Sequence, residues 1–212
     1  MAEIIVRPKA FTREWFSYVW DYYKYHILIS VALIVILVIS TVQIITSVKY
    51  DTNINFIAES VIATEKAEEI AALCAKNSDD LNNNGRVDIS FTQLNFTPQN
   101  RQNGEMLAAL YSKRDAVFSS NDELVFIVDE IMRDETLEMK STKNMFYEVS
   151  EWTKEDSLKK GSYAVSLAES NVLKNLNIDS SNLYVMIAKY DHEDGFKPQE
   201  KNAIKIANFL LK

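Results

Sequence analysis

One long apolar stretch divides the chain into two parts of different character. Residues 27–48 read ILISVALIVILVISTVQIITSV and contain no charged side chain over 22 positions. A helix of this length is about 33 Å long, enough to cross a hydrocarbon core of about 30 Å. A core helix of a soluble protein is usually shorter and keeps a polar stripe. The pattern therefore predicts a transmembrane helix over 27–48.

A cleaved signal peptide is the alternative interpretation of this stretch. Its apolar region would be about 7–15 residues long and would end at a small-x-small cleavage site. The stretch here is longer, and Ile45-Thr46-Ser47 is a poor site of that kind. An uncleaved signal anchor is therefore expected.

The distribution of basic residues predicts the orientation of the helix. Four Lys or Arg residues precede the stretch, whereas only Lys49 and Lys66 lie within about 20 residues after it. The positive-inside rule then places the N-terminus in the cytoplasm and residues 49–212 outside, in a single-pass protein of the cell membrane.

The segment before the helix, residues 1–26, is rich in aromatic side chains. Phe11, Trp15, Val19, Tyr22 and His26 follow helical spacing. Trp and Tyr are favoured at the membrane–water boundary. We therefore expect a helix that starts at the interface and continues into the membrane. A partner-binding surface within the bilayer is the alternative.

Residues 49–212 alternate between strand and helix patterns. Short apolar or alternating runs, typical of strands, are 54–58, 87–91, 124–128 and 183–188. Helical patterns cover 64–76, 106–118, 130–139, 171–176 and a segment from 198 onward. Residues 140–170 show no clear pattern. This order predicts one extracytoplasmic α/β sandwich domain with a mainly parallel sheet.

Charge and cysteine content exclude several classes of function. Residues 1–26 carry a net charge of +1 and residues 49–212 a net charge of −8. An acidic domain is a poor nucleic-acid binder, because phosphate contacts need a basic face. The single cysteine, Cys74, allows no intramolecular disulfide and no thiolate metal cluster. Its place on the apolar side of a helical pattern indicates a core residue.

The best local motif lies in residues 79–88, DDLNNNGRVD. It resembles the calcium loop of EF-hand and dockerin modules, in which oxygen ligands alternate along a tight turn around one cation. The candidate ligands, at loop positions one, three, five, seven and nine, are Asp80, Asn82, Asn84, Arg86 through its backbone carbonyl, and Asp88.

This calcium loop departs from the family pattern at its end. The twelfth position, which holds a bidentate acid in the family, is Phe91. Any calcium binding is expected to be weak, with a dissociation constant of about 10⁻⁴–10⁻³ M. The alternative is an Asx-rich turn with Gly85 in a left-handed conformation.

The residues give little support for catalysis. A Ser-His-acid triad would have to use His192, which lies in a polar loop of the kind that is usually solvated. The pair Asp129-Glu130 follows a strand pattern, where α/β folds place ligands, but such a pair also suits the first turn of a helix. We expect a protein that is not an enzyme.

Several segments carry a resemblance to a known group of proteins. They are the run Trp20-Asp21-Tyr22-Tyr23-Lys24-Tyr25-His26 before the apolar stretch, the loop 80–87, and Ser170-Asn171-Val172-Leu173 ahead of the apolar run 183–188. This order resembles uncharacterised single-pass membrane proteins of Gram-positive bacteria. Their outer domain is similar to a one-lobe fragment of an extracellular solute-binding protein. The resemblance implies a location and a fold, and no activity.

Two functions are compatible with these features. The first is a protein-interaction domain, such as an accessory subunit of a transport or envelope assembly, which predicts an exposed apolar patch. The second is a small-ligand-binding module, which predicts a concave pocket with convergent polar groups. Its candidate contacts, at strand ends, are Glu59, Asn95, Asp129 and Asp191.

Overall fold

The computed structural model describes residues 10–46, 49–120, 122–139, 141, 145–153, 161–189 and 196–212. The chain forms two compact units, Met1–Val48 and Lys49–Lys212.

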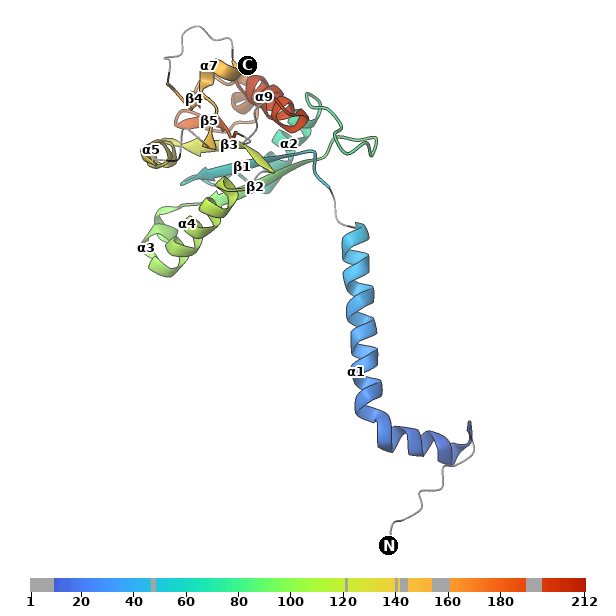
Figure 1. Ribbon diagram of the computed structural model, residues 1–212. Coiled ribbons are helices and arrows are strands. Elements are labelled where there is room, and N and C mark those ends of the chain that lie inside the picture. Colours follow the sequence, from blue (N-terminus) through green and yellow to red (C-terminus); the bar gives the residue numbers. More distant parts are fainter. Residues whose placement is uncertain are drawn as a thin grey trace. The chain divides into compact units, whose positions relative to one another are not determined.

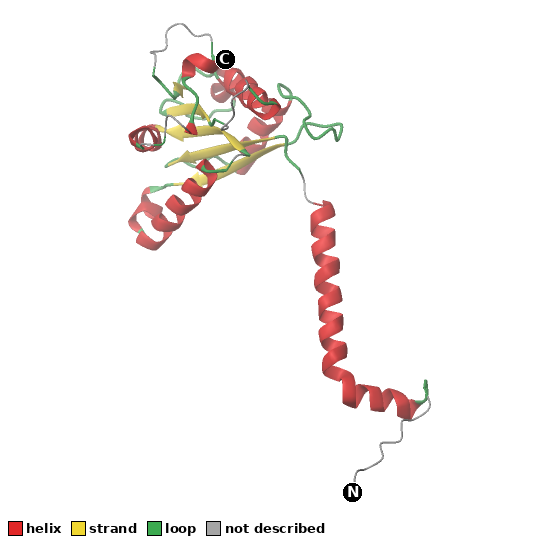
Figure 2. Cartoon of the chain, viewed as in Figure 1, coloured by secondary structure: helices red, strands yellow, loops and turns green. Residues whose placement is uncertain are grey.

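The first unit is built on one long helix, α1 (Arg13–Thr46). Its portion Arg13–Gln43 is, among the described residues, the one helix long and apolar enough to cross a membrane. None of that portion is buried within the protein. Figures 1 and 2 show that the axis of α1 turns sharply between its first turns and its long remainder. A membrane anchor and a signal sequence would both have such an apolar helix.

The second unit is organised around a sheet of five strands in the order β2-β1-β3-β5-β4. The strands are β1 (Thr52–Ala58), β2 (Ile89–Asn95), β3 (Glu123–Asp129), β4 (Val165–Ser166) and β5 (Leu183–Ile187). β1 pairs in parallel with β2 and β3, whereas β5 runs antiparallel to both β3 and β4. The α/β class is confirmed, and the sheet is mixed: β2, β1 and β3 are parallel to one another, whereas β5 is antiparallel to its neighbours.

Helices connect the strands of this unit. They are α2 (Thr64–Ala75), α3 (Pro98–Gln102), α4 (Gly104–Phe118), α5 (Glu130–Glu138), α7 (Val149–Trp152), α8 (Asn171–Asn175) and α9 (Pro198–Leu210). All five segments with helical patterns are helical. The unassigned region 140–170 contributes the four-residue α7 and the two-residue β4. Elements this short give no readable period.

The two faces of the sheet are covered by different helices. Figure 1 shows α2 and α9 packed on one face and α4 on the other. On the first face, α2 contributes Ala67, Ile70 and Cys74 to the core, all buried. Cys74 is fully buried, and this burial raises the pKa of its thiol to about 12.

An aromatic cluster fills the core beneath α4. Phe126 of β3 makes edge-to-face contacts with Phe118 of α4 at 5.1 Å and with Phe146 at 5.7 Å between ring centroids. Phe118 and Phe146 also meet, at 5.4 Å. Such aromatic pairs add to the free energy gained from burial alone. This cluster therefore fixes α4 against the sheet.

The same sheet face carries one buried polar side chain in its interior. Asn55 lies in the middle of β1 and is 1% exposed. Its Nδ2 donates a hydrogen bond of 2.6 Å to Oε2 of Glu123 on the neighbouring β3. The pair satisfies the amide group, which would be costly to bury without a partner.

A buried polar contact also joins α9 to the segment before α7. Glu200 is fully buried, and one of its carboxylate oxygens accepts a hydrogen bond from the hydroxyl of Tyr147. Its other oxygen accepts one from the backbone N–H of Lys197 at 2.7 Å. Burial first, and then the hydrogen bond to Glu200, raise the pKa of Tyr147. Glu200 thus caps α9 and anchors it to the core.

We predict that the aromatic cluster dominates the stability of the α4 face. Phe126→Ala should lower the free energy of unfolding by about 3–5 kcal/mol, because it removes a large side chain from a site that cannot collapse freely. Val61→Ala, at a position that is 59% exposed, is the control and should cost less than about 0.5 kcal/mol. Urea unfolding of the full-length protein in detergent measures both. Similar losses in the two variants would contradict the prediction.

Candidate functional site

The calcium-like loop is held to the sheet by a residue outside it. Asp51 immediately precedes β1 and is 5% exposed. Its Oδ1 accepts hydrogen bonds from the backbone N–H groups of Leu81 at 2.8 Å and Asn82 at 3.0 Å. Its Oδ2 accepts one from the N–H of Asp88 at 2.8 Å. One buried carboxylate therefore fastens both ends of the loop to the start of β1.

Within the loop, the predicted ligands bind backbone N–H groups. Asp80 accepts hydrogen bonds from the N–H groups of Asn84 at 3.3 Å and Gly85 at 2.8 Å. Oδ1 of Asn82 accepts one from Asn84, and Oδ1 of Asn84 accepts one from Arg86. Gly85 has a φ of +86°, the left-handed conformation that the Asx-rich turn requires. These bonds form a closed turn.

The remaining features of the loop suit calcium poorly. Nε of Arg86 lies 2.6 Å from Oδ2 of Asp88, so a cationic side chain already occupies that carboxylate. Phe91, at the twelfth loop position, stacks on Phe56 at 6.2 Å. Among the described residues there is no group of three or more His, Cys, Asp or Glu side chains arranged to hold a metal ion. The bonds favour the turn, and calcium binding stays an untested alternative.

Two of the predicted strand-end residues, Glu59 and Asp129, lie at a second candidate site. At this site the connections that follow neighbouring strands run toward opposite sides of the sheet. β1 leads through α2 to β2 on one side of itself, and β2 leads through α3 and α4 to β3 on the other side. In open α/β sheets, ligands bind beyond the carboxyl ends of the strands at such a switch point. β1 ends at Ala58 and β3 ends at Asp129.

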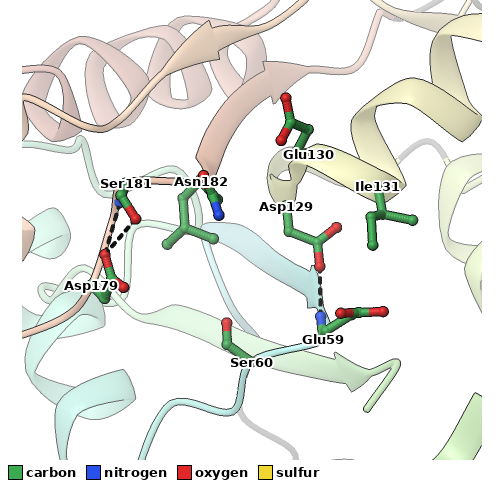
Figure 3. Close-up of a pocket in the computed structure, with 9 residues that line it drawn as sticks. Glu59, Ser60, Asp129, Glu130, Ile131, Asp179, Ser181 and Asn182 are labelled. Carbon is green, nitrogen blue, oxygen red and sulfur yellow. Dashed lines mark hydrogen bonds between the residues drawn. The ribbon is translucent and has the colours of Figure 1, made fainter. Parts of the chain in front are cut away.

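A cavity of about 290 Å³ opens at this switch point (Figure 3). Its lining residues are Glu59, Ser60, Asp129, Glu130, Ile131, Asp179, Ser181, Asn182 and Leu183. Because β5 is antiparallel, its first residue, Leu183, pairs with Asp129 at the end of β3. The segment that precedes β5 therefore forms a wall of the cavity.

Asp129 holds two elements of the cavity in place. Its Oδ2 accepts a hydrogen bond of 2.6 Å from the backbone N–H of Glu59, and its Oδ1 accepts one of 2.8 Å from Met132. The second bond caps the N-terminus of α5. Asp129 is thus a positioning residue that links the end of β1 to the start of α5.

The other three acidic side chains of the cavity have partners of different kinds. Glu59 pairs with Arg101 at 3.0 Å, and Glu130 pairs with Arg133 at 3.3 Å. Asp179 accepts hydrogen bonds from both the N–H and the hydroxyl of Ser181, and these bonds lower its pKa. Figure 3 shows the Asp179–Ser181 pair on one side of the cavity and the Asp129–Glu59 pair on the other. Among the residues that the structure describes, four carboxylates and no basic side chain line the cavity.

The remaining predicted contacts lie elsewhere. Asn95 ends β2 and does not line this cavity, and its buried Oδ1 accepts no hydrogen bond from the described residues. Asp191 and His192 fall outside the described residues. The sequence reasoning missed Asp179, Ser181 and Asn182, although the polar run 179–182 directly before an apolar strand was visible as a signal.

A second hollow of about 280 Å³ adjoins the cavity and shares Ser60, Asp179 and Leu183 with it. Its wall also includes Val61, which is 59% exposed. Lys66 lines this second hollow as well, with its Nζ donating a hydrogen bond of 2.8 Å to the backbone carbonyl of Asn177. The two hollows together form a groove with acidic and apolar parts and one basic side chain among the described residues.

Comparison of the chain with family models, curated protein sequences and solved structures finds no match.

We predict that Asp51 is required for stability. Asp51→Ala should lower the free energy of unfolding by about 3 kcal/mol, because three backbone N–H groups lose a charged acceptor. Asp134→Ala, at an exposed carboxylate paired with Arg133, is the matched control and should cost less than about 0.5 kcal/mol. Urea titration of the full-length protein compares the two, and a loss at Asp51 no larger than at Asp134 would contradict this role.

We predict that millimolar calcium leaves the melting temperature of the full-length protein unchanged, since the loop oxygens already accept hydrogen bonds. Differential scanning fluorimetry with calcium and with magnesium tests this. A rise that is specific to calcium and absent in Asp80→Ala would instead establish a metal loop.

Proposed function

We propose that the chain is a membrane-anchored, non-enzymatic binding protein whose α/β domain lies outside the cytoplasm and takes a small cationic ligand in the switch-point cavity. The observation that carries this proposal is the lining of the cavity, in which the described residues supply four carboxylates and no basic side chain.

The charges around the cavity support a cation as the ligand. Glu59 and Glu130 already pair with Arg101 and Arg133. Asp179 instead accepts hydrogen bonds from the neutral Ser181, so Asp179 is the carboxylate best placed to bind a cation. A primary amine donates three hydrogen bonds and suits such a set of carboxylate, hydroxyl and amide oxygens. The net charge of −8 on residues 49–212 would also steer cations toward the domain.

The size of the cavity supports a small ligand. A volume of about 290 Å³ is at the lower end of the range for small-molecule sites. The bonds of Asp129 to two backbone N–H groups favour a structural role for this carboxylate over one in proton transfer. These features support binding without catalysis.

A protein partner is the second candidate ligand, in keeping with an accessory subunit of a transport or envelope assembly. The observation that favours it is the exposure of Ile131, at 43%, and Val61, at 59%, along the groove. A segment with a basic and an apolar side chain would meet both the acidic and the apolar parts of this groove.

We predict that small amines stabilise the full-length protein. Ethanolamine, putrescine and lysine methyl ester are suitable probes, with sucrose and glutamate as neutral and acidic comparisons. A ligand present at 100 times its dissociation constant adds about 2.7 kcal/mol to the stability of the folded state. A rise in melting temperature with one of the amines, and none with glutamate, is the expected result in differential scanning fluorimetry.

Three variants test whether the stabilisation by amines arises from binding in the switch-point cavity. Asp179→Asn and Glu130→Gln remove charge from the cavity wall and should weaken the amine effect several-fold. Glu105→Gln removes an exposed charge in the first turn of α4 that does not line the cavity, and should leave the effect intact. No stabilisation by any amine, or equal loss in all three variants, would overturn the small-cation proposal.

A further inference from the structure

The first turns of α1 carry their polar residues on one side. At 100° per residue, the polar side chains from position 13 to position 24 fall within an arc of about 100°. They are Arg13, Glu14, Ser17, Asp21 and Lys24. This polar stripe is the narrow side of an amphipathic helix.

The rest of the circumference is mainly aromatic and exposed. Phe16 is 57% exposed, Trp20 is 54% exposed and Tyr25 is 69% exposed. The ring contacts of this segment are with neighbours in the same segment, as between Tyr18 and Tyr22 at 5.2 Å. Within the unit Met1–Val48, this broad aromatic face is therefore exposed.

The bend in α1 determines how the aromatic face is oriented relative to the long apolar remainder of the helix. Figures 1 and 2 show the first turns running at a steep angle to the long apolar remainder. If the remainder crosses the membrane, the first turns run along its surface. A straight helix would instead carry either the polar stripe into hydrocarbon or the aromatic face into water, and both are unfavourable.

We propose that residues 13–26 form an in-plane interfacial helix, with the aromatic face buried in the lipid headgroup–acyl boundary and the polar stripe facing water. The occupant of the aromatic face is the lipid surface, because the segment is continuous with the apolar stretch of α1. Amphipathic helices with aromatic faces bind membrane interfaces in this way. The inference rests on the membrane anchoring in the proposed function.

The charges of the stripe specify the kind of membrane. Arg13 and Lys24 are balanced by Glu14 and Asp21, so the stripe has no net charge. Polybasic helices gain affinity from anionic lipids, whereas this helix would be held by apolar burial alone. We therefore expect this helix to bind vesicles made of phosphatidylcholine alone, without anionic lipid.

Spin labels on opposite faces of the helix test the arrangement in the full-length protein reconstituted in phosphatidylcholine vesicles. Nitroxides are attached to Ser17→Cys on the polar stripe, to Val19→Cys on the aromatic face, and to Val35→Cys within the apolar stretch as a reference. The native Cys74 is fully buried and does not compete for the label. Collision with oxygen, which enters lipid, is compared with collision with a water-soluble nickel chelate.

An oxygen-to-nickel collision ratio several-fold higher at position 19 than at position 17, with a high ratio at 35, is the expected result. Equal ratios at 17 and 19 with a high ratio at 35 would overturn the in-plane helix and leave the anchor intact. Position 19 shielded from both reagents would overturn it in favour of a protein partner. A low ratio at 35 would refute the anchor itself, and the inference with it.

Discussion

A polar side chain buried in the interior of β1 or β3 is costly without a hydrogen-bond partner, and this constraint determines where most polar groups of the domain lie. Thr52, at the start of β1, is an exception, because its buried hydroxyl has no partner among the described residues. The strands β1 and β3 are covered on both faces, and an unpaired polar group there would be costly. Asn55 is tolerated because Glu123 bonds to it. Most other polar groups are displaced to the strand ends. Parallel pairing then aligns those ends, so that Glu59 and Asp129 meet at one edge of the sheet and Asp51 organises the other.

Much of the fold was readable because burial leaves a pattern in the residues. The mainly apolar run of β1 and the apolar runs of β3 and β5 predicted strands, and the spacing of buried positions in α2 and α9 predicted helices. The direction of β5 was not readable, since an apolar run buries equally well in a parallel or an antiparallel strand. The elements α7 and β4 were missed because four and two residues carry no measurable period.

The candidate site was predicted where it depended on single strands and missed where it depended on how the strands pair. Glu59 and Asp129 follow apolar runs, and the rule that ligands lie beyond strand ends needs no further information. Asp179 and Ser181 reach the same cavity only because β5 is reversed and brings its beginning to that edge. For the loop 79–88, a calcium site and an Asx turn require the same oxygens and the same left-handed glycine. The pairing of Arg86 with Asp88, which favours the turn, is visible only in three dimensions.

The burial of Cys74 has a consequence for the surroundings that the domain can tolerate. Because burial raises the pKa of the Cys74 thiol well above its usual value, very little of the reactive thiolate is present at neutral pH. Disulfide exchange and oxidation to sulfenic acid both proceed through the thiolate, and the packed core also blocks access to the sulfur. Since this is the one cysteine in the chain, the fold neither requires an oxidising compartment nor is threatened by one through its cysteine chemistry.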